Sequence, residues 1–233
     1  MAMTVVVGGT VGQAGPMDVV VVGGHGKIGL RLARVLTGAG HTVRSVVRNP
    51  DHAPDVEAAG GRPALVDIEG PDAVAGLTEA AEGADAVVFA AGAGPGSGAE
   101  RKQTVDLGGA VALIAAARTV GIDRYVMVSS IGADRPEEGR GPMRAYLQAK
   151  ADADAALRAS DLAWTVVRPV SLTDEPGTGR VTVAEHLDHR GTVPRDDVAA
   201  VLAALLVDGS AVGRVLEVAS GDAAVADALA PFT

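Results

Sequence analysis

Residues 19–29 read VVVVGGHGKIG, four valines followed by glycines at positions 23, 26 and 29. Consecutive β-branched residues are typical of a strand that is buried on both faces. After Gly29, apolar side chains recur at helical spacing in Leu32, Ala33 and Leu36. In such a strand–turn–helix unit, one glycine makes the tight turn, one lets the backbone approach a pyrophosphate, and one packs the helix on the strand. The stretch therefore predicts a dinucleotide pyrophosphate held by the N–H groups at the start of a helix.

A second glycine series lies upstream, at Gly9, Gly12 and Gly15, after another run of valines. Pro16 and a further strand-like run follow it, so no helix can begin there and the structural context is missing. We therefore predict an N-terminal extension over residues 1–16. A single dinucleotide-binding domain is predicted over residues 17–233.

Short apolar runs alternate along the chain with helical segments rich in Ala and Leu. The predicted strands cover residues 18–22, 42–47, 63–66, 86–89, 124–129, 164–167 and 214–218. The predicted helices cover residues 28–37, 73–80, 105–119, 145–159 and 197–207, and residues 173–194 are expected to be irregular. This alternation predicts a doubly wound parallel sheet in an α/β protein, a three-layer α/β/α Rossmann fold.

Composition narrows the function classes. The chain has 233 residues, a net charge of −9 and no cysteine. Disulfides and thiolate metal sites are excluded, and the acidic balance argues against a nucleic-acid partner. No apolar run approaches the roughly 20 residues that span a bilayer, so we expect no membrane partner and a cytoplasmic location. His186 and His189 lack further clustered ligands, so we expect no metal site.

The end of the second predicted strand bears on the type of dinucleotide. An NAD site usually has Asp or Glu there, about 20 residues after the glycines. This chain has Arg48 instead, with Arg44 close by, and a guanidinium suits a 2′-phosphate. NADP is therefore favoured over NAD, which stays possible. The alternative interpretation of Arg48 is a solvated turn residue with no role in cofactor binding. His25 and Lys27 are further candidates for phosphate contacts, and Asp67 for the adenine edge or a turn cap.

Tyr146 and Lys150 are four residues apart in a predicted helix, so their side chains share one face. A tyrosine hydroxyl is a poor acid–base catalyst at neutral pH, and a nearby ammonium stabilises its phenolate form. Ser129 and Ser130 end the fifth predicted strand, at the edge where open α/β sheets bind ligands. The alternative is a surface lysine beside a half-buried tyrosine.

The motifs together resemble a known family, the atypical short-chain dehydrogenase/reductases of the NAD(P)H-binding, epimerase/dehydratase-like group. Biliverdin-IX-beta-reductase-like flavin reductases and NmrA-like proteins are relatives. The resemblance rests on VVGGHGKIG (21–29), YVMVSSIGA (125–133), YLQAKAD (146–152), WTVVRP (164–169), VPRDDVA (193–199) and LEVASGD (216–222).

The resemblance implies a particular set of cofactor contacts. They are Gly23, Gly26 and Gly29 at the pyrophosphate, Arg48 at the 2′-phosphate, Asp67 and Ile68 near the adenine, and Ala90, Ala91 and Gly92 beside the cofactor. We further predict contacts from His25, Lys27, Ile28, Ser129 and Lys150. The spacing from Ser130 to Tyr146 is longer than usual in the main dehydrogenase family, and members of this group often lack a complete catalytic tetrad.

The leading hypothesis is an NADP-dependent oxidoreductase that transfers hydride between nicotinamide and a small carbonyl, quinone or flavin-like substrate. Tyr146 would donate the proton, Lys150 would tune it and bind ribose, and Ser130 would orient the acceptor. One alternative is a non-catalytic NADP sensor of the NmrA-like kind. Another is a sugar-nucleotide epimerase or dehydratase, which the chain length disfavours. The substrate lining is expected from residues 93–103, 132–144 and 173–191, and the protein is expected to be a monomer or homodimer.

Overall fold

The computed structural model describes residues 15–94, 96–188 and 191–233. Most of the predicted extension, residues 1–14, lies outside the described residues. Among the described residues a nine-stranded sheet has the order β11-β8-β10-β6-β5-β4-β1-β2-β3. Its strands are β1 (Asp18–Val22), β2 (Thr42–Val47), β3 (Arg62–Leu65), β4 (Ala86–Phe89), β5 (Arg124–Val128), β6 (Ala163–Pro169), β8 (Arg180–Ala184), β10 (Arg214–Ser220) and β11 (Ala223–Ala224).

Seven of these strands, β1 to β6 and β10, run parallel, and β1 pairs with β2 on one side and β4 on the other. The chain therefore winds outward from β1 in both directions, as the alternation of strands and helices predicts. The order of the strands reverses between β1 and β4. Sheets of this kind bind ligands at such a switch point, beside the carboxyl ends of the two strands.

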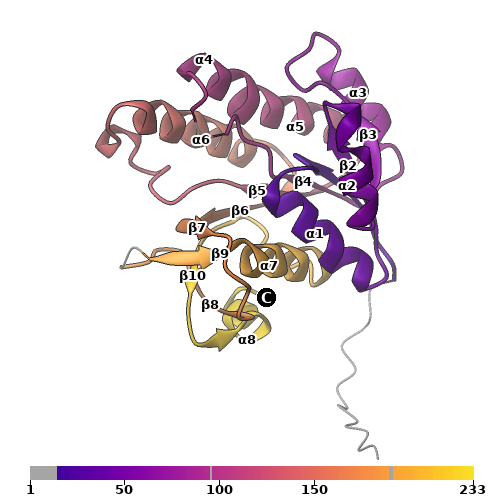
Figure 1. Cartoon of the computed structure of the whole chain (residues 1–233). Coiled ribbons are helices and arrows are strands. Elements are labelled where there is room, and N and C mark those ends of the chain that lie inside the picture. Colours follow the sequence, from indigo (N-terminus) through magenta and orange to yellow (C-terminus); the bar gives the residue numbers. More distant parts are fainter. Residues whose placement is uncertain (1–14, 95, 189–190) are drawn as a thin grey trace, which may run out of the picture.

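Helices cover both faces of the sheet (Figure 1). Helices α1 (Lys27–Gly38) and α7 (Arg195–Val207) pack together on one face. Helices α3 (Ala73–Ala81), α5 (Gly109–Val120) and α6 (Pro142–Arg158) cover the other. Short helices α2 (Ala53–Ala58), α4 (Ala99–Arg101) and α8 (Val225–Leu229) complete the order. The three-layer Rossmann architecture is confirmed.

The valines of β1 explain why this strand is central. Val19 and Val21 join the core beneath α1 and α7, whereas Val20 and Val22 join the core beneath α3 and α5. All four are fully buried. The side chains on both faces of β1 are therefore covered by helices. For this reason the strand does not alternate between apolar and polar residues.

The expectation of an irregular segment over residues 173–194 is wrong. This segment contains β8 and β9 (Thr192–Pro194), and β7 (Ser171–Thr173) reaches into its start. Strand β8 is antiparallel to β10, and β7 pairs with β9 in a separate two-stranded sheet. Short strands need only a few residues of extended chain, so the surrounding glycines and charges hid them from a pattern search.

The predicted helix over residues 105–119 also begins earlier than expected. A π-helical segment, Lys102–Gly108, joins α4 to α5. Such wide turns are rare in proteins, and those that occur are often found at functional sites. Here the segment carries two buried charged side chains, Lys102 and Asp106, towards the carboxyl edge of the sheet.

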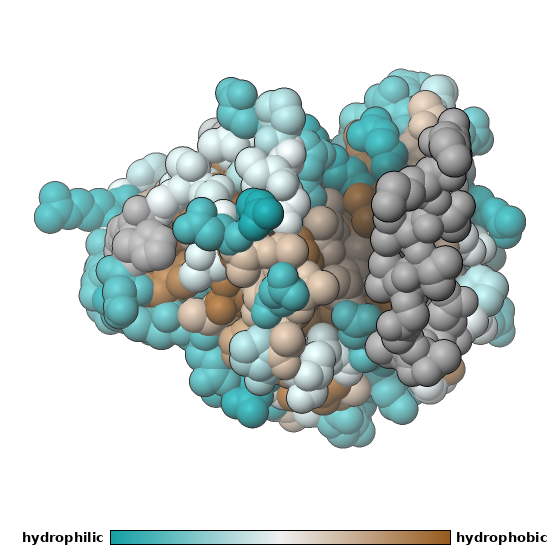
Figure 2. All heavy atoms as spheres, turned by 90° about the horizontal axis from the view of Figure 1, so that it is seen from below, coloured by the Kyte–Doolittle hydropathy of each residue, from teal (hydrophilic) through white to brown (hydrophobic). Residues whose placement is uncertain are grey.

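In the part of the chain that the structure describes, no helix is long and apolar enough to cross a bilayer. Figure 2 shows one face, on which hydrophilic side chains project and hydrophobic ones lie mainly in the recesses between them.

Candidate cofactor and active site

The glycine loop between β1 and α1 is shaped by close backbone contacts. Gly23 has a φ of +87°, and a Cβ atom there would lie 2.6 Å from the Ala91 nitrogen. A Cβ atom on Gly29 would collide with the Gly23 carbonyl oxygen. The Gly26 N–H donates to that same oxygen at 2.9 Å. Each of the three glycines therefore permits an approach that a side chain would prevent.

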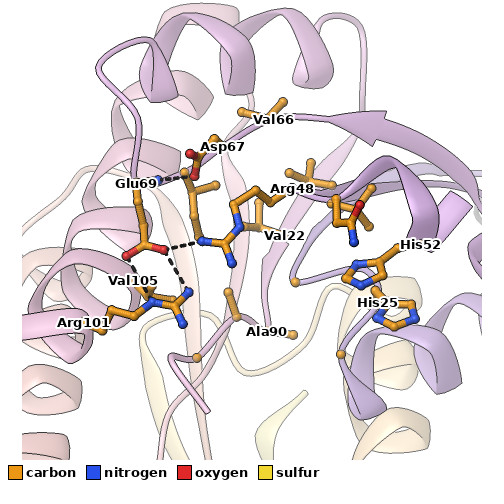
Figure 3. Close-up of a pocket in the computed structure, with 18 residues that line it drawn as sticks. Val22, His25, Arg48, His52, Val66, Asp67, Glu69, Ala90, Arg101 and Val105 are labelled. Atoms are coloured by element: carbon orange, nitrogen blue, oxygen red, sulfur yellow. Dashed lines mark hydrogen bonds and ion pairs between the residues drawn. The ribbon is translucent and has the colours of Figure 1, made fainter. Parts of the chain in front are cut away.

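A cavity of about 510 Å³, the glycine-loop cavity, opens above this turn between β1, β2 and β4 (Figure 3). Its apolar wall is formed by Val22, Val47, Val66, Ile68 and Val105. The glycine loop closes one end, with Ala90, Ala91 and Gly92 beside it. Helix α1 begins directly after the loop, and no acidic side chain lies in its first turn. The cavity thus combines an apolar slot with the positive end of a helix.

Arg48 lines this cavity, as the sequence predicts, but it is ion-paired. Its guanidinium lies 2.8 Å from a carboxylate oxygen of Glu69, which also binds Arg101 at 2.9 Å (Figure 3). The Thr104 hydroxyl donates to Glu69 at 2.7 Å. The hydrogen bond from Arg101 is the main cause that lowers the pKa of the Glu69 carboxyl. The sequence did not point to Glu69, and it placed Arg101 only within the expected substrate lining of residues 93–103.

Two histidines form another wall of the glycine-loop cavity. The rings of His25 and His52 are stacked with centroids 3.6 Å apart. His25 Nε2 lies 2.8 Å from an Asp55 carboxylate oxygen. Figure 3 shows this stacked pair on the side of the cavity away from Glu69. His25 thus lies where the sequence places it, and His52 was not anticipated.

Two cations that the sequence suggested lie elsewhere. Lys27 is ion-paired with Asp174, is largely exposed and lines neither this cavity nor the one around Tyr146. Arg44 binds Asp18 and the Glu82 carbonyl oxygen at the opposite end of β2. Arg44 shares a face of β2 with Arg48, but it lies in the amino-terminal half of the strand, whereas the cavity opens at the carboxyl end. Asp67 lines the cavity and also accepts the Glu69 N–H at 3.1 Å, so it caps a turn.

A second cavity of about 490 Å³, the tyrosine cavity, adjoins the first and shares Ala90, Ala91 and Gly92 with it. Tyr146, Lys150, Ser129 and Ile28 line it. The structure therefore brings the Tyr-x-x-x-Lys pair of α6 and the end of β5 next to the glycine loop. The sequence order of these motifs predicts this proximity.

The Lys150 side chain is held by three groups. Its ammonium lies 3.1 Å from Asp106 Oδ1 and donates to the Val128 carbonyl oxygen at 3.2 Å. A longer contact of 3.4 Å reaches the Ala91 carbonyl oxygen. The Tyr146 ring centroid is 6.0 Å from the same ammonium. A buried carboxylate thus fixes the lysine beside the tyrosine.

Asp106 was missed by sequence analysis, although a signal exists. It lies on the helical stripe that continues through Ala110, Leu113 and Ala117, all of which are fully buried. A carboxylate on an otherwise apolar stripe is almost never buried unless it is paired. Its other oxygen accepts the Ala93 N–H at 3.1 Å, so it also anchors the loop after β4.

The two serines after β5 face different surroundings. Ser129 is buried and lines the tyrosine cavity. Ser130 lines only the neighbouring outer cavity of about 650 Å³, and its hydroxyl donates to the Ile131 carbonyl oxygen at 3.2 Å. Consecutive residues of an extended chain point to opposite sides, which separates them. Ser129 therefore shares a cavity with both Tyr146 and Lys150, whereas Ser130 shares only the outer cavity with Tyr146.

The described residues contain no group of three or more His, Asp or Glu side chains arranged to hold a metal ion. His189 lies outside the described residues.

Residues 23–209 match the family described as NAD(P)H-binding. The chain belongs to this NAD(P)H-binding family. The match begins at the first glycine of the loop and extends through α7, so it spans both cavities.

Similar proteins agree with this assignment. The Bacillus subtilis protein named "Uncharacterized sugar epimerase YhfK" is 39% identical over 91% of this chain and 99% of its own length. A structure from Bacillus halodurans, whose name places it among the NAD-dependent epimerase/dehydratases, has a TM-score of 0.87 and is 38% identical over 93% of this chain and 100% of its own. The oxidoreductase ylbE of Lactococcus lactis has a TM-score of 0.79 and is 25% identical over 92% of this chain and 96% of its own. These relatives fit the atypical short-chain dehydrogenase/reductases.

The site of this NAD(P)H-binding protein fits a dinucleotide on structural grounds. The loop backbone can approach a phosphate closely because Gly23 and Gly26 carry no side chain, and their tight packing against Ala91 and the Gly23 carbonyl oxygen fixes the shape of the turn. The apolar slot suits a base, and the shared residues Ala90 to Gly92 connect it to the tyrosine cavity, where the other ring would lie.

Proposed function

We propose that the protein is an NADP-dependent oxidoreductase that reduces a small carbonyl, quinone or flavin-like substrate. The observation that carries the proposal is the shared cavity of Tyr146, Lys150 and Ser129, which is continuous with the glycine-loop cavity through Ala90 to Gly92. A pure cofactor sensor needs no acid beside the nicotinamide end of its site, whereas a carbonyl reductase does.

The residues of the tyrosine cavity have complementary tasks. A bound reduced nicotinamide supplies the hydride. Tyr146 donates a proton to the substrate oxygen, and the Lys150 ammonium stabilises the negative charge left on the tyrosine. Asp106 fixes Lys150, and the Ser129 hydroxyl donates to the substrate oxygen. Ser130, to which the sequence assigns that task, lines the outer cavity instead.

The preference for NADP rests on the charges around the glycine-loop cavity. Arg48 and Arg101 supply two guanidinium groups, both paired with the Glu69 carboxylate, and Asp67 is a second carboxylate in the lining. A 2′-phosphate there would gain bidentate, charge-assisted hydrogen bonds. The stacked His25 and His52 add polar N–H groups on the opposite wall.

Residues 17–233 are proposed to form a single domain. Strand β10, close to the C-terminal end, lies in the same sheet as β1. A division of the chain between these strands would break that sheet. Both cavities belong to the same carboxyl edge, so the cofactor and substrate sites are parts of the same unit.

Titration with NADPH and with NADH tests the cofactor assignment, with energy transfer from Trp164 or calorimetry as the readout. We expect NADPH to bind at least 10-fold more tightly, because each charge-assisted hydrogen bond contributes about 1.5–3 kcal/mol. NADH binding as tight as that of NADPH would refute the role of Arg48.

Turnover by Tyr146→Phe tests the chemistry against a panel of aldehydes, quinones and flavins. Loss of a general acid should lower kcat by about 10²-fold or more, with the NADPH dissociation constant unchanged. The matched control is Tyr125→Phe, since Tyr125 lies in the core and donates to the Ala110 carbonyl oxygen at 3.2 Å. A loss below about threefold for Tyr146→Phe would exclude the acid role.

Epimerase or dehydratase chemistry is the second candidate, because the names of two relatives carry it. It would use the same tyrosine on a sugar nucleotide, with no net consumption of cofactor. Product analysis on a sugar-nucleotide panel separates the two candidates. Binding of NADPH without any turnover in either assay would instead indicate a sensor.

A further inference from the structure

Lys102 is a buried lysine in the tyrosine cavity that sequence analysis did not single out. It begins the π-helical segment, is 7% exposed and lines the cavity together with Tyr146 and Lys150. Its ammonium lies 5.3 Å from the centroid of the Tyr146 ring and donates to the Ser97 hydroxyl at 3.2 Å. The chain has only three lysines, at positions 27, 102 and 150, so two of the three are buried around this tyrosine.

The two buried lysines differ in their partners. Lys150 is neutralised by Asp106, whereas Lys102 has no carboxylate within ion-pair distance among the described residues. The residues outside the described ranges, 1–14, 95 and 189–190, include no Asp or Glu. No acidic side chain of this chain is therefore available from those segments. Within the described ranges, the partners of the Lys102 ammonium are a hydroxyl and an aromatic face.

Such an arrangement is costly for the protein alone. A buried ammonium loses its hydration, and a hydroxyl with one aromatic face replaces only part of it. Surface lysines avoid this cost because their charged ends reach water. Lys102 lies on a cavity wall, so an anion bound in the cavity would supply the missing counter-charge.

The outer cavity continues this electrostatic bias. It shares Ser129, Met143, Tyr146 and Leu172 with the tyrosine cavity, so the two form one cleft. Arg135, Arg140 and Arg195 line it with a single carboxylate, Glu138. Over both linings, five cationic side chains face two carboxylates, in a chain whose net charge is −9. Lys150, Arg135 and Arg195 are ion-paired, with Asp106, Glu138 and Asp174 respectively, so Lys102 and Arg140 are the two without a carboxylate partner among the described residues. A cleft of this charge attracts anions.

We propose that the substrate carries an anionic group, a carboxylate or a phosphate, and that Lys102 binds this group beside Tyr146. The proposal rests on the oxidoreductase function proposed above and names its substrate class. The cofactor phosphates are an unsuitable partner, because Lys102 does not line the glycine-loop cavity. The short separation between the Lys102 ammonium and the Tyr146 ring places the anionic group close to the reacting carbon.

Matched probes test the proposal on the full chain. Phenylglyoxylate is an α-keto acid, and phenylglyoxamide is its neutral counterpart. We expect the complex with NADP to bind phenylglyoxylate about 10-fold or more tightly than the amide in calorimetry, as a charge-assisted hydrogen bond implies. Benzoylphosphonate, compared in the same way, distinguishes a phosphate-like from a carboxylate group. Initial rates with NADPH should show the same preference in KM.

Variants assign the preference to this lysine. Lys102→Met should reduce the ratio of carboxylate to amide affinity to near one, and Lys102→Arg should retain most of it. Lys27→Met removes an exposed ammonium outside both cavities and should leave the ratio as in the wild type. An equal ratio in the wild type and Lys102→Met overturns the proposal. A Lys102-dependent preference in binding without reduction of either probe would support it and count against the oxidoreductase function. Reduction of both probes with equal KM would overturn the proposal and support the oxidoreductase function.

Discussion

Lys150 and Asp106 form a buried ion pair, with Nζ and Oδ1 3.1 Å apart and side chains 4% and 0% exposed. The pair joins α6 to the π-helical segment before α5, and it holds the lysine against the carboxyl ends of β4 and β5. Removal of one partner from a buried pair leaves an uncompensated charge, which is more damaging than loss of both.

We therefore expect Asp106→Asn to lower the free energy of unfolding by about 3 kcal/mol, although the amide can still accept the Ala93 N–H. A double-mutant cycle with Lys150→Met, measured by urea denaturation, should give a coupling energy of about 1.5 kcal/mol or more. A coupling energy below about 0.5 kcal/mol would show that the two charges act independently.

Gly29 and Gly38 lie on the same helix, α1, in opposite surroundings. A Cβ atom on Gly29 would collide with the Gly23 carbonyl oxygen, whereas nothing lies within 4 Å of one on Gly38. We expect Gly29→Ala to weaken NADPH binding at least 10-fold and to lower the melting temperature. Gly38→Ala should stabilise the protein by roughly 0.5–1 kcal/mol through helix propensity alone. Thermal denaturation and NADPH titration of both variants check the contrast, and equal effects would contradict it.

The parts of the site that sequence analysis located depend on local patterns. The glycine loop follows from the spacing of Gly23, Gly26 and Gly29 and the helix behind them, within a single strand–turn–helix unit. Tyr146 and Lys150 share a face because of helical spacing. Patterns of this kind involve residues within a few turns of each other, so no knowledge of the assembled sheet is needed.

The parts that it missed depend on pairs of distant residues. Glu69 meets Arg48 only when β2 and β3 are paired, and Asp106 meets Lys150 only when α6 packs beside the π-helical segment. Composition cannot indicate which of many carboxylates will meet which cation. Lys27 and Arg44 lie away from the cavities for the same reason, because Asp174 and Asp18 bind them there.

Tyr125 gives a prediction for alkaline pH. Burial raises its pKa well above the usual value of 10.0, so ionisation opposes folding. Because the folded pKa exceeds the unfolded one, this stability is fully present below pH 10 and is lost as the pH rises towards the folded pKa. The unfolding free energy should fall by up to about 1.4 kcal/mol per pH unit above 10. Urea denaturation at pH 8 and pH 11 should show a smaller decrease in Tyr125→Phe. Equal decreases would contradict this.

The Glu69 carboxylate connects Arg48 and Arg101, and its charge opposes that of a 2′-phosphate. We expect Glu69→Gln to raise NADPH affinity several-fold, because both guanidinium groups then lose their internal partner, while NADH affinity changes little. Arg48→Ala should lower NADPH affinity about 10-fold, again with little change for NADH. Arg62→Ala on β3, outside the glycine-loop cavity, is the matched control for loss of a positive charge. If Glu69→Gln weakened NADPH binding instead, the carboxylate would be needed to position Arg48, and its repulsion of the phosphate would be the smaller effect.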